Sequence, residues 1–134
     1  MIRVLATLIG MTLAGCATAV TEPPAAGVVL RAIDGDTLAL GAERIRLIGV
    51  DTPELRGARC TMEWAKAEEA RVYVQRALNG ARSVDIERRE VEPPKRYGRT
   101  LAIVRVDGAD LAALLIKEGL GRPYDGRGKR RPWC

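Results

Sequence analysis

The pattern of apolar and polar positions first indicates a β-rich half between residues 27 and 50. Short runs of Val, Ile, Leu and Thr are separated by turn sequences at Asp34-Gly35 and Gly41 to Glu43. Runs of this length, bounded by Gly and Asp, are typical of strands in hairpins. The pattern predicts three strands in meander order, at Val28 to Ile33, Thr37 to Leu40 and Arg44 to Val50.

The apolar period changes to that of a helix after residue 60. From Thr61 to Leu78 apolar residues recur every three or four positions, as they do along the buried face of a helix. Thr61 can serve as the N-cap, and Asn79-Gly80 as the stop signal. This is the one long helix that the sequence predicts.

Two further strands follow, at about Ser83 to Val91 and Thr100 to Val106. After the Asp107-Gly108 turn, leucines mark a short amphipathic helix that Gly119 ends. Five short strands with one helix between the third and the fourth are the order of an OB-fold barrel. The predicted fold class is therefore α+β, with a barrel whose open face commonly binds oligonucleotides. The fold alone does not establish the chemistry.

The first residues have the pattern of an export signal. One basic residue, Arg3, precedes an apolar run that is too short to span a membrane. The run ends in Leu13-Ala14-Gly15-Cys16, which looks like a bacterial lipobox and predicts a lipid anchor on the Cys16 thiol. We expect residues 1–15 to be a signal peptide, 16–26 a tether and 27–134 the folded domain, exported and anchored to the cell envelope. Ordinary cleavage after Ala19 is the alternative.

The chain contains three cysteines, an odd number for an exported protein. Lipidation of Cys16 would leave Cys60 and Cys134 to pair in an oxidising compartment. A disulfide closing so long a loop stabilises a fold by about 4 kcal/mol on the chain-entropy model. Two free thiols remain the alternative, because the sequence gives no distance between them.

The net charge and the absence of histidine limit the partners and the catalytic groups that this protein can use. A chain beginning at Cys16 retains 21 basic residues against 17 acidic ones, a net charge of +4. This excess is compatible with a polyanionic partner but is also found on ordinary surfaces. Because the sequence contains no His, any catalysis must rely on carboxylates and arginines, with or without a metal ion.

Two charged clusters occur where predicted strands end. Asp36 follows the first turn, and Asp51 and Glu54 follow the third strand. Three carboxylates beside an apolar barrel suggest a cation, and their hard oxygens suit Ca²⁺ or Mg²⁺. Arg46 lies inside a strand, where a charged side chain is costly unless it meets a partner or ligand. The plainer alternatives are a hairpin turn at Asp34-Gly35 and a paired structural arginine.

The segments Ile33 to Thr37, Arg46 to Glu54 and Arg96 to Arg99 resemble, in order, the motifs of the staphylococcal nuclease (thermonuclease) family. The resemblance covers most of residues 27–124. It implies Ca²⁺-dependent hydrolysis of phosphodiesters in DNA or RNA, with products that carry 3′-phosphate and 5′-hydroxyl ends. We also expect a monomer whose partners are the nucleic acid substrate and, through the lipid anchor at Cys16, the membrane.

The resemblance assigns roles to individual residues. Asp36 and Asp51 would bind Ca²⁺ through their carboxylates, and Thr52 through its backbone carbonyl. Glu54 matches the general base that takes a proton from the attacking water. The phosphate-clamping arginines match the two positions Arg46 and Arg99.

Other positions match less strictly. Arg96, Tyr97 and Tyr124 resemble residues that contact the substrate phosphate or stack near a base. The end of the chain departs from the Staphylococcus enzyme, whose further helix we expect to be missing here. Its terminal Cys134 is expected to secure the tail to the loop after Glu54. The basic residues of this tail either follow a phosphate backbone or are simply solvated.

A non-catalytic nucleic-acid-binding OB-fold lipoprotein is the main competing hypothesis. Such a module does not need three carboxylates close to a polyanion, which they would repel. A structural envelope lipoprotein would leave Arg46 and Arg99 unexplained. The sequence therefore favours the enzyme.

Overall fold

The computed structural model describes residues 29–134. The predicted signal peptide, the lipidation site at Cys16 and the tether all lie outside these residues. The strands are β1 (Leu30–Ala32), β2 (Thr37–Leu40), β3 (Glu43–Leu47), β4 (Gly49–Asp51), β5 (Val84–Val91), β6 (Thr100–Val106), β7 (Ala109–Asp110) and β8 (Arg122–Tyr124). The helices are α1 (Thr61–Gly80) and α2 (Leu111–Lys117).

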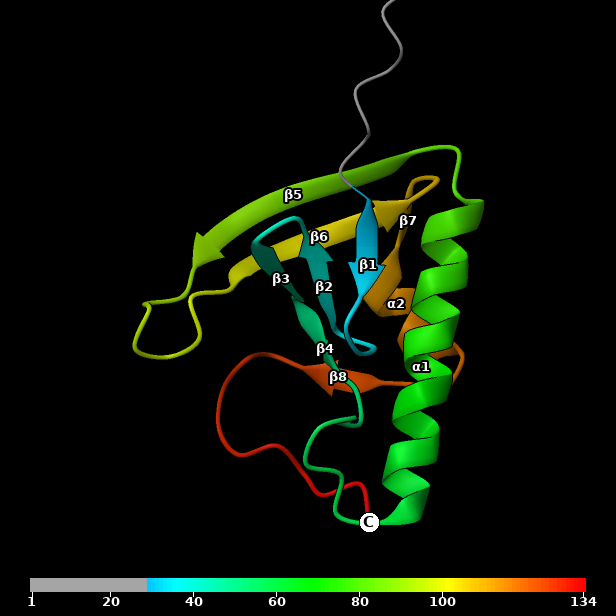
Figure 1. The fold of residues 1–134 in the computed structure, drawn as a ribbon, viewed down its shortest axis with the longest axis vertical. Coiled ribbons are helices and arrows are strands. Elements are labelled where there is room, and N and C mark those ends of the chain that lie inside the picture. Colours follow the sequence, from blue (N-terminus) through cyan, green and yellow to red (C-terminus); the bar gives the residue numbers. More distant parts are fainter. Residues whose placement is uncertain (1–28) are drawn as a thin grey trace, which may run out of the picture.

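Five strands form the main sheet in the order β1-β2-β3-β6-β5, and the short β7 adds to this sheet by pairing with β6. Antiparallel pairing joins β1 to β2, β2 to β3 and β5 to β6, whereas β3 and β6 are parallel. With α1 between the third and fourth of these five strands, this is the strand order of the predicted OB-fold. Figure 1 shows β5 and β6 as a long curved ribbon that crosses the shorter strands.

The strand count differs from the prediction because short segments pair outside the five main strands. The expected strand from Arg44 to Val50 is broken at Ile48, and its second part, β4, leaves the main sheet to pair with β8. Gly49 permits this break because its φ of 90° is unfavourable for other residues. The described chain thus has eight strand segments: β7 and β8 were not predicted, and β4 was predicted only as the end of the third strand.

Helix α1 forms because its apolar positions share one face. Ala67, Ala70, Val74 and Leu78 are buried against the sheet, which Figure 1 shows alongside the helix. The N-cap is Cys60 rather than the predicted Thr61, since the Cys60 sulfur accepts a hydrogen bond from the Glu63 amide at 3.4 Å. Neither helix in the described part of the chain is both long and apolar enough to cross a membrane.

The core lies between the sheet, α1 and α2. Leu38 of β2, Ile45 of β3 and Leu111 and Leu115 of α2 are fully buried, and burial of each such side chain contributes about 1.5–3 kcal/mol. Strand β6 alternates strictly between buried and half-buried positions, as expected of a strand with one face on the core. This core holds the ends of β2 and β4 in place, and these strand ends carry the acidic residues.

Candidate active site

The two aspartates predicted to bind a cation are adjacent in the structure. Asp36 lies just before β2 and Asp51 ends β4, and only 3% and 2% of their surfaces are exposed. The Thr52 amide donates a hydrogen bond of 2.9 Å to Asp36 Oδ2. This bond crosses between the two motifs and fixes one carboxylate beside the backbone that follows the other.

Arg46 points into the same site from β3, where it lies opposite Thr37 in the ladder with β2. It forms an ion pair with the Asp36 carboxylate, and its Nη1 also donates to the Asp36 carbonyl oxygen at 3.3 Å. Arg46 is only 7% exposed. A buried guanidinium needs such a partner, because desolvating an unpaired charge is unfavourable.

Asp51 is held by an arginine that the sequence did not single out. Arg122 lies directly opposite Asp51 in the β4–β8 ladder, and two of its nitrogens contact Asp51 Oδ2 at 3.1 and 3.2 Å. Gly121 makes this close approach possible, since a Cβ there would lie 2.5 Å from Val50 Cγ2. The other oxygen of Asp51 accepts a bond of 3.1 Å from Arg130.

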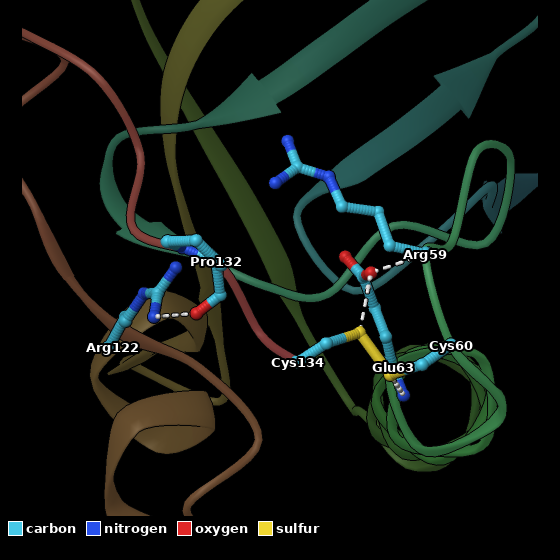
Figure 2. The surroundings of a disulfide bond; sticks show 6 residues. All are labelled: Arg59, Cys60, Glu63, Arg122, Pro132 and Cys134. Carbon is cyan, nitrogen blue, oxygen red and sulfur yellow. Dashed lines mark hydrogen bonds between the residues drawn. A yellow bond between two sulfur atoms is a disulfide. The ribbon is translucent and has the colours of Figure 1, made fainter.

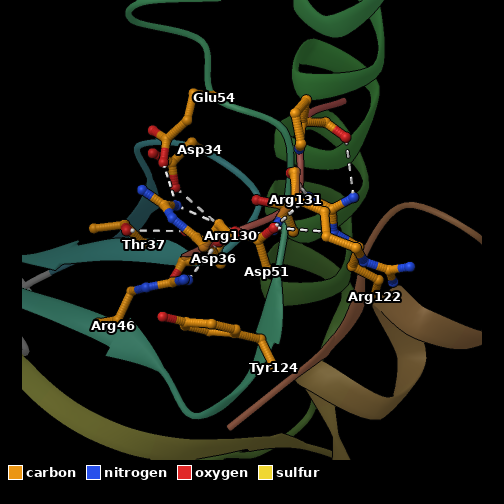
Figure 3. Close-up of polar contacts among 12 residues, drawn as sticks. Asp34, Asp36, Thr37, Arg46, Asp51, Glu54, Arg122, Tyr124, Arg130 and Arg131 are labelled. Carbon is orange, nitrogen blue, oxygen red and sulfur yellow. Dashed lines mark hydrogen bonds and ion pairs between the residues drawn. The ribbon is translucent and has the colours of Figure 1, made fainter. Parts of the chain in front are cut away.

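Glu54, the predicted general base, lies at the rim of the site. Its side chain is 37% exposed, and its Oε1 is 2.5 Å from Arg130 Nη1. Arg130 comes from the C-terminal tail and bridges Glu54 and Asp51 (Figure 3). The predicted base is therefore paired with an arginine of the C-terminal tail.

Asp34 is a further carboxyl group at the site that sequence reasoning treated only as part of a turn. Burial, followed by the charges of Asp36 and Glu54, raises the pKa of Asp34 to about 7. Like charges crowded in a partly buried site disfavour ionisation in this way. The Asp34-Gly35-Asp36 spacing was the available signal, because the second acid suggests more than a hairpin turn.

Arg99 and Tyr97 lie together at the end of the β5–β6 hairpin. Arg99 forms two hydrogen bonds with the Glu92 carboxylate, at 2.8 and 2.9 Å, and lies 4.7 Å from the centre of the Tyr97 ring. The Arg99 guanidinium lowers the pKa of Glu92. Arg99 therefore has a carboxylate partner of its own and does not share that of Arg46.

Of the remaining predicted substrate contacts, Tyr124 lies at the site and Arg96 does not contact its acids. The Tyr124 hydroxyl donates to the Gly128 carbonyl at 3.2 Å, and its ring extends from β8 toward Arg46 in Figure 3. Arg96 is exposed in the loop between β5 and β6. Within residues 29–134, no ion pair involves Arg96.

The tail is tied to the start of α1 by a disulfide between Cys60 and Cys134 (Figure 2). Next to it, Trp133 stacks on Arg122, with the guanidinium carbon 4.1 Å from the ring centre. Arg122 Nη1 also donates to the Pro132 carbonyl at 3.2 Å. The disulfide therefore keeps the last residues of the chain against the arginine that holds Asp51.

The oxygen atoms at this site are those that a hard divalent cation prefers. Asp36 and Asp51 are buried carboxylates, and the Thr52 hydroxyl oxygen is buried without a hydrogen-bond partner. In the described part of the chain no three Asp, Glu or Cys side chains converge tightly enough to form a ready metal cage. Arginines instead contact the carboxylates, so a cation would have to share or replace these contacts.

Comparison with known proteins agrees with this arrangement. A model of the family described as staphylococcal nuclease homologue matches residues 44–132. The chain is 39% identical over 101 residues to Thermonuclease from Staphylococcus intermedius, which covers 71% of this chain and 57% of that protein. It is 33% identical over 96 residues to Endonuclease YncB from Bacillus subtilis (strain 168), covering 69% and 44%.

A third relative carries a different kind of name. The chain is 35% identical over 108 residues to Succinoglycan biosynthesis protein ExoI from Rhizobium meliloti (strain 1021), covering 72% of this chain and 52% of that protein. The chain spans about half the length of these curated relatives. The strand order, the motifs in sequence order and the match over residues 44–132 lead to one conclusion: this chain belongs to the family of staphylococcal nuclease homologues.

Proposed function

We propose that this protein is a metal-dependent phosphodiesterase that hydrolyses DNA, RNA or both. The observation that carries the proposal is the convergence of Asp36, Arg46, Asp51 and Glu54 at one end of an OB-fold. Relatives named Thermonuclease and Endonuclease support the same assignment. A module that only binds nucleic acid would gain nothing from carboxylates that repel its ligand.

The metal of the proposal is Ca²⁺, held by Asp36, Asp51 and an oxygen of Thr52. Carboxylate and neutral oxygens are the ligands that Ca²⁺ accepts. Thr52 offers two such neutral oxygens, its backbone carbonyl, which is the predicted ligand, and its hydroxyl, which is buried without a hydrogen-bond partner. When bound, the cation would supply positive charge beside the phosphate oxygens and lower the pKa of nearby water.

Glu54 is proposed to accept the proton of the attacking water or to orient that water. A general base must be ionised and within hydrogen-bond reach of its water. Glu54 is partly exposed at the rim, where water can reach its carboxylate, and its Oε1 is paired with Arg130. Arg130 contacts only Oε1, and Oε2 of Glu54 forms no hydrogen bond or ion pair within residues 29–134, so this second oxygen is the one that can accept a proton from water.

Arg46 and Arg99 are proposed to bind the phosphate. The planar guanidinium group matches two phosphate oxygens at once, and this contact strengthens as charge grows on them in the transition state. In the free protein both arginines are paired with carboxylates, Asp36 and Glu92. These partners hold the two guanidinium groups in place before substrate arrives.

Export and lipidation of Cys16 are also proposals. They are supported by the Leu13 to Cys16 motif and by the Cys60–Cys134 disulfide, which suits an oxidising compartment. Metabolic labelling with a radioactive fatty acid tests them. Label on the wild-type protein, absent from Cys16→Ser, would support the anchor, and an unlabelled protein would exclude it.

The chemistry of the product ends tests the proposed reaction. The purified protein is incubated with single-stranded DNA and Ca²⁺, and the fragments are offered to polynucleotide kinase without prior dephosphorylation. Cleavage that leaves 5′-hydroxyl ends makes every internal fragment a substrate for the kinase. Fragments that accept phosphate only after phosphatase treatment would contradict the proposed direction of bond breaking.

A further inference from the structure

Arg130 lies in the site, but the proposed reaction gives it no role. It is the one residue of the described tail after Tyr124 whose side chain pairs with the site's carboxylates, through Asp51 Oδ1 at 3.1 Å and Glu54 Oε1 at 2.5 Å. A small polar cavity of about 90 Å³ lies there, lined by Asp51, Thr52, Glu54 and Arg130 among others. The guanidinium thus lies between a proposed cation ligand and the proposed base.

The segment that carries Arg130 is fixed at both of its ends. The segment that carries it begins at the end of β8, which pairs with β4, and ends at the Cys60–Cys134 disulfide. Figure 1 shows this red segment returning past the loop after β4 to the first turn of α1. A short segment fixed at both ends keeps its side chains near the site at a high effective concentration.

A cation bound to the same carboxylate oxygen would weaken this contact. Asp51 Oδ2 is already held by Arg122, so Oδ1, the oxygen that Arg130 contacts, is the one left for a metal ion. A guanidinium and a divalent cation beside one carboxylate oxygen repel each other. Because the Arg130 side chain is 43% exposed, it is free to move outward.

We infer that Arg130 is a substrate-positioning residue that exchanges partners. It holds Asp51 and Glu54 in the free protein, is displaced when a divalent cation binds, and then contacts a phosphate group of the bound strand. Phosphate offers the same paired oxygens that a guanidinium meets in a carboxylate. The inference rests on the proposed function and adds one residue to it.

Binding measurements on Arg130→Gln test the exchange without any need for turnover. Isothermal titration with CaCl₂ measures cation affinity, and fluorescence anisotropy with a phosphorothioate single strand in the presence of Ca²⁺ measures binding of the strand. Arg127→Gln is the matched control, because it removes the same charge from the same tail. The Arg127 side chain forms no ion pair within residues 29–134.

Removing the competing guanidinium should tighten Ca²⁺ binding about fivefold, whereas Arg127→Gln should change it less than twofold. The strand should bind Arg130→Gln about fivefold more weakly than wild type, with a shallower salt dependence. A merely structural role would not move the two affinities in opposite directions. Thermal unfolding of each variant verifies that the fold is intact.

Two results would overturn the inference: Ca²⁺ affinity in Arg130→Gln no higher than in Arg127→Gln, or a strand affinity equal to that of wild type. The failure of the proposed function looks different. In that case the wild-type protein itself binds no divalent cation and cleaves no nucleic acid. A wild type that does both, with variants that shift neither affinity, would contradict only the role of Arg130.

Discussion

Replacing Cys60 and Cys134 with serine removes the link between the tail and α1 while keeping an acceptor at the N-cap of α1. The Cys60 sulfur accepts a hydrogen bond from the Glu63 amide, and a serine hydroxyl at this position can accept the same bond. The double variant Cys60→Ser/Cys134→Ser therefore isolates the cross-link. The variant Cys60→Ala/Cys134→Ser, which also loses the cap, should be about 1 kcal/mol less stable still.

The size of the effect follows from the loop that the disulfide closes. The two cysteines are 74 residues apart, and the chain-entropy model gives roughly 4 kcal/mol for a loop of that length. The full loss is expected only if the tail stays docked without the bond, since a detached tail regains its own disorder. The contacts of Trp133 with Arg122 and of Arg130 with Asp51 favour docking.

Urea and thermal unfolding followed by far-UV circular dichroism measure the loss. For a domain of this size, roughly 4 kcal/mol corresponds to a fall in Tm of about 15 °C or more. Limited proteolysis of the tail shows whether it remains docked. A loss below about 1 kcal/mol with a protease-resistant tail would refute the reasoning, because the cross-link would then constrain nothing in the unfolded chain.

Two further predictions concern the packing beside the site and its acid sensitivity. Gly35→Ala should cost about 1–3 kcal/mol in unfolding free energy, because a Cβ there would lie 2.8 Å from the Thr52 side chain; a Tm equal to wild type would contradict this. Hydrogen bonds from Arg88 and then from Thr100 lower the pKa of Glu43 to about 2. Their stabilising contribution is therefore complete above the ordinary carboxyl pKa and lost as pH falls from about 4.5 toward 2, so Glu43→Gln should flatten the stability profile in that range, and an unchanged profile would exclude Glu43 as its source.

Periodicity predicted the parts of the fold that bury one face. Strand β6, with its strict alternation, and α1, with its apolar positions three and four residues apart, both lie where the sequence indicated. The acids Asp36 and Asp51 could be placed together because they flank adjacent predicted strands, Asp36 just before the second strand and Asp51 just after the third. The local pattern is sufficient in such cases, since a strand or helix that buries one face repeats its apolar residues with the period of that element.

The tail could not be predicted in the same way. Strand β8 has three residues, includes Pro123 and is too short for its sequence to show a strand pattern, and it is defined by its pairing with the distant β4. The contact between Arg122 and Asp51 depends on that register, and the position of Arg130 depends on the disulfide. The expected link between Cys134 and the loop after Glu54 was the only signal that the basic tail would meet acidic residues.

Degradation of single-stranded DNA by the purified protein, with Ca²⁺ or with a chelator and beside Glu54→Gln, tests the central claim most directly. The account predicts cutting that requires Ca²⁺ and falls about a hundredfold or more in the variant, the loss expected when a general base is removed. A wild-type protein that binds the strand but does not cut it with any divalent cation would contradict the account and identify a nucleic-acid-binding module instead.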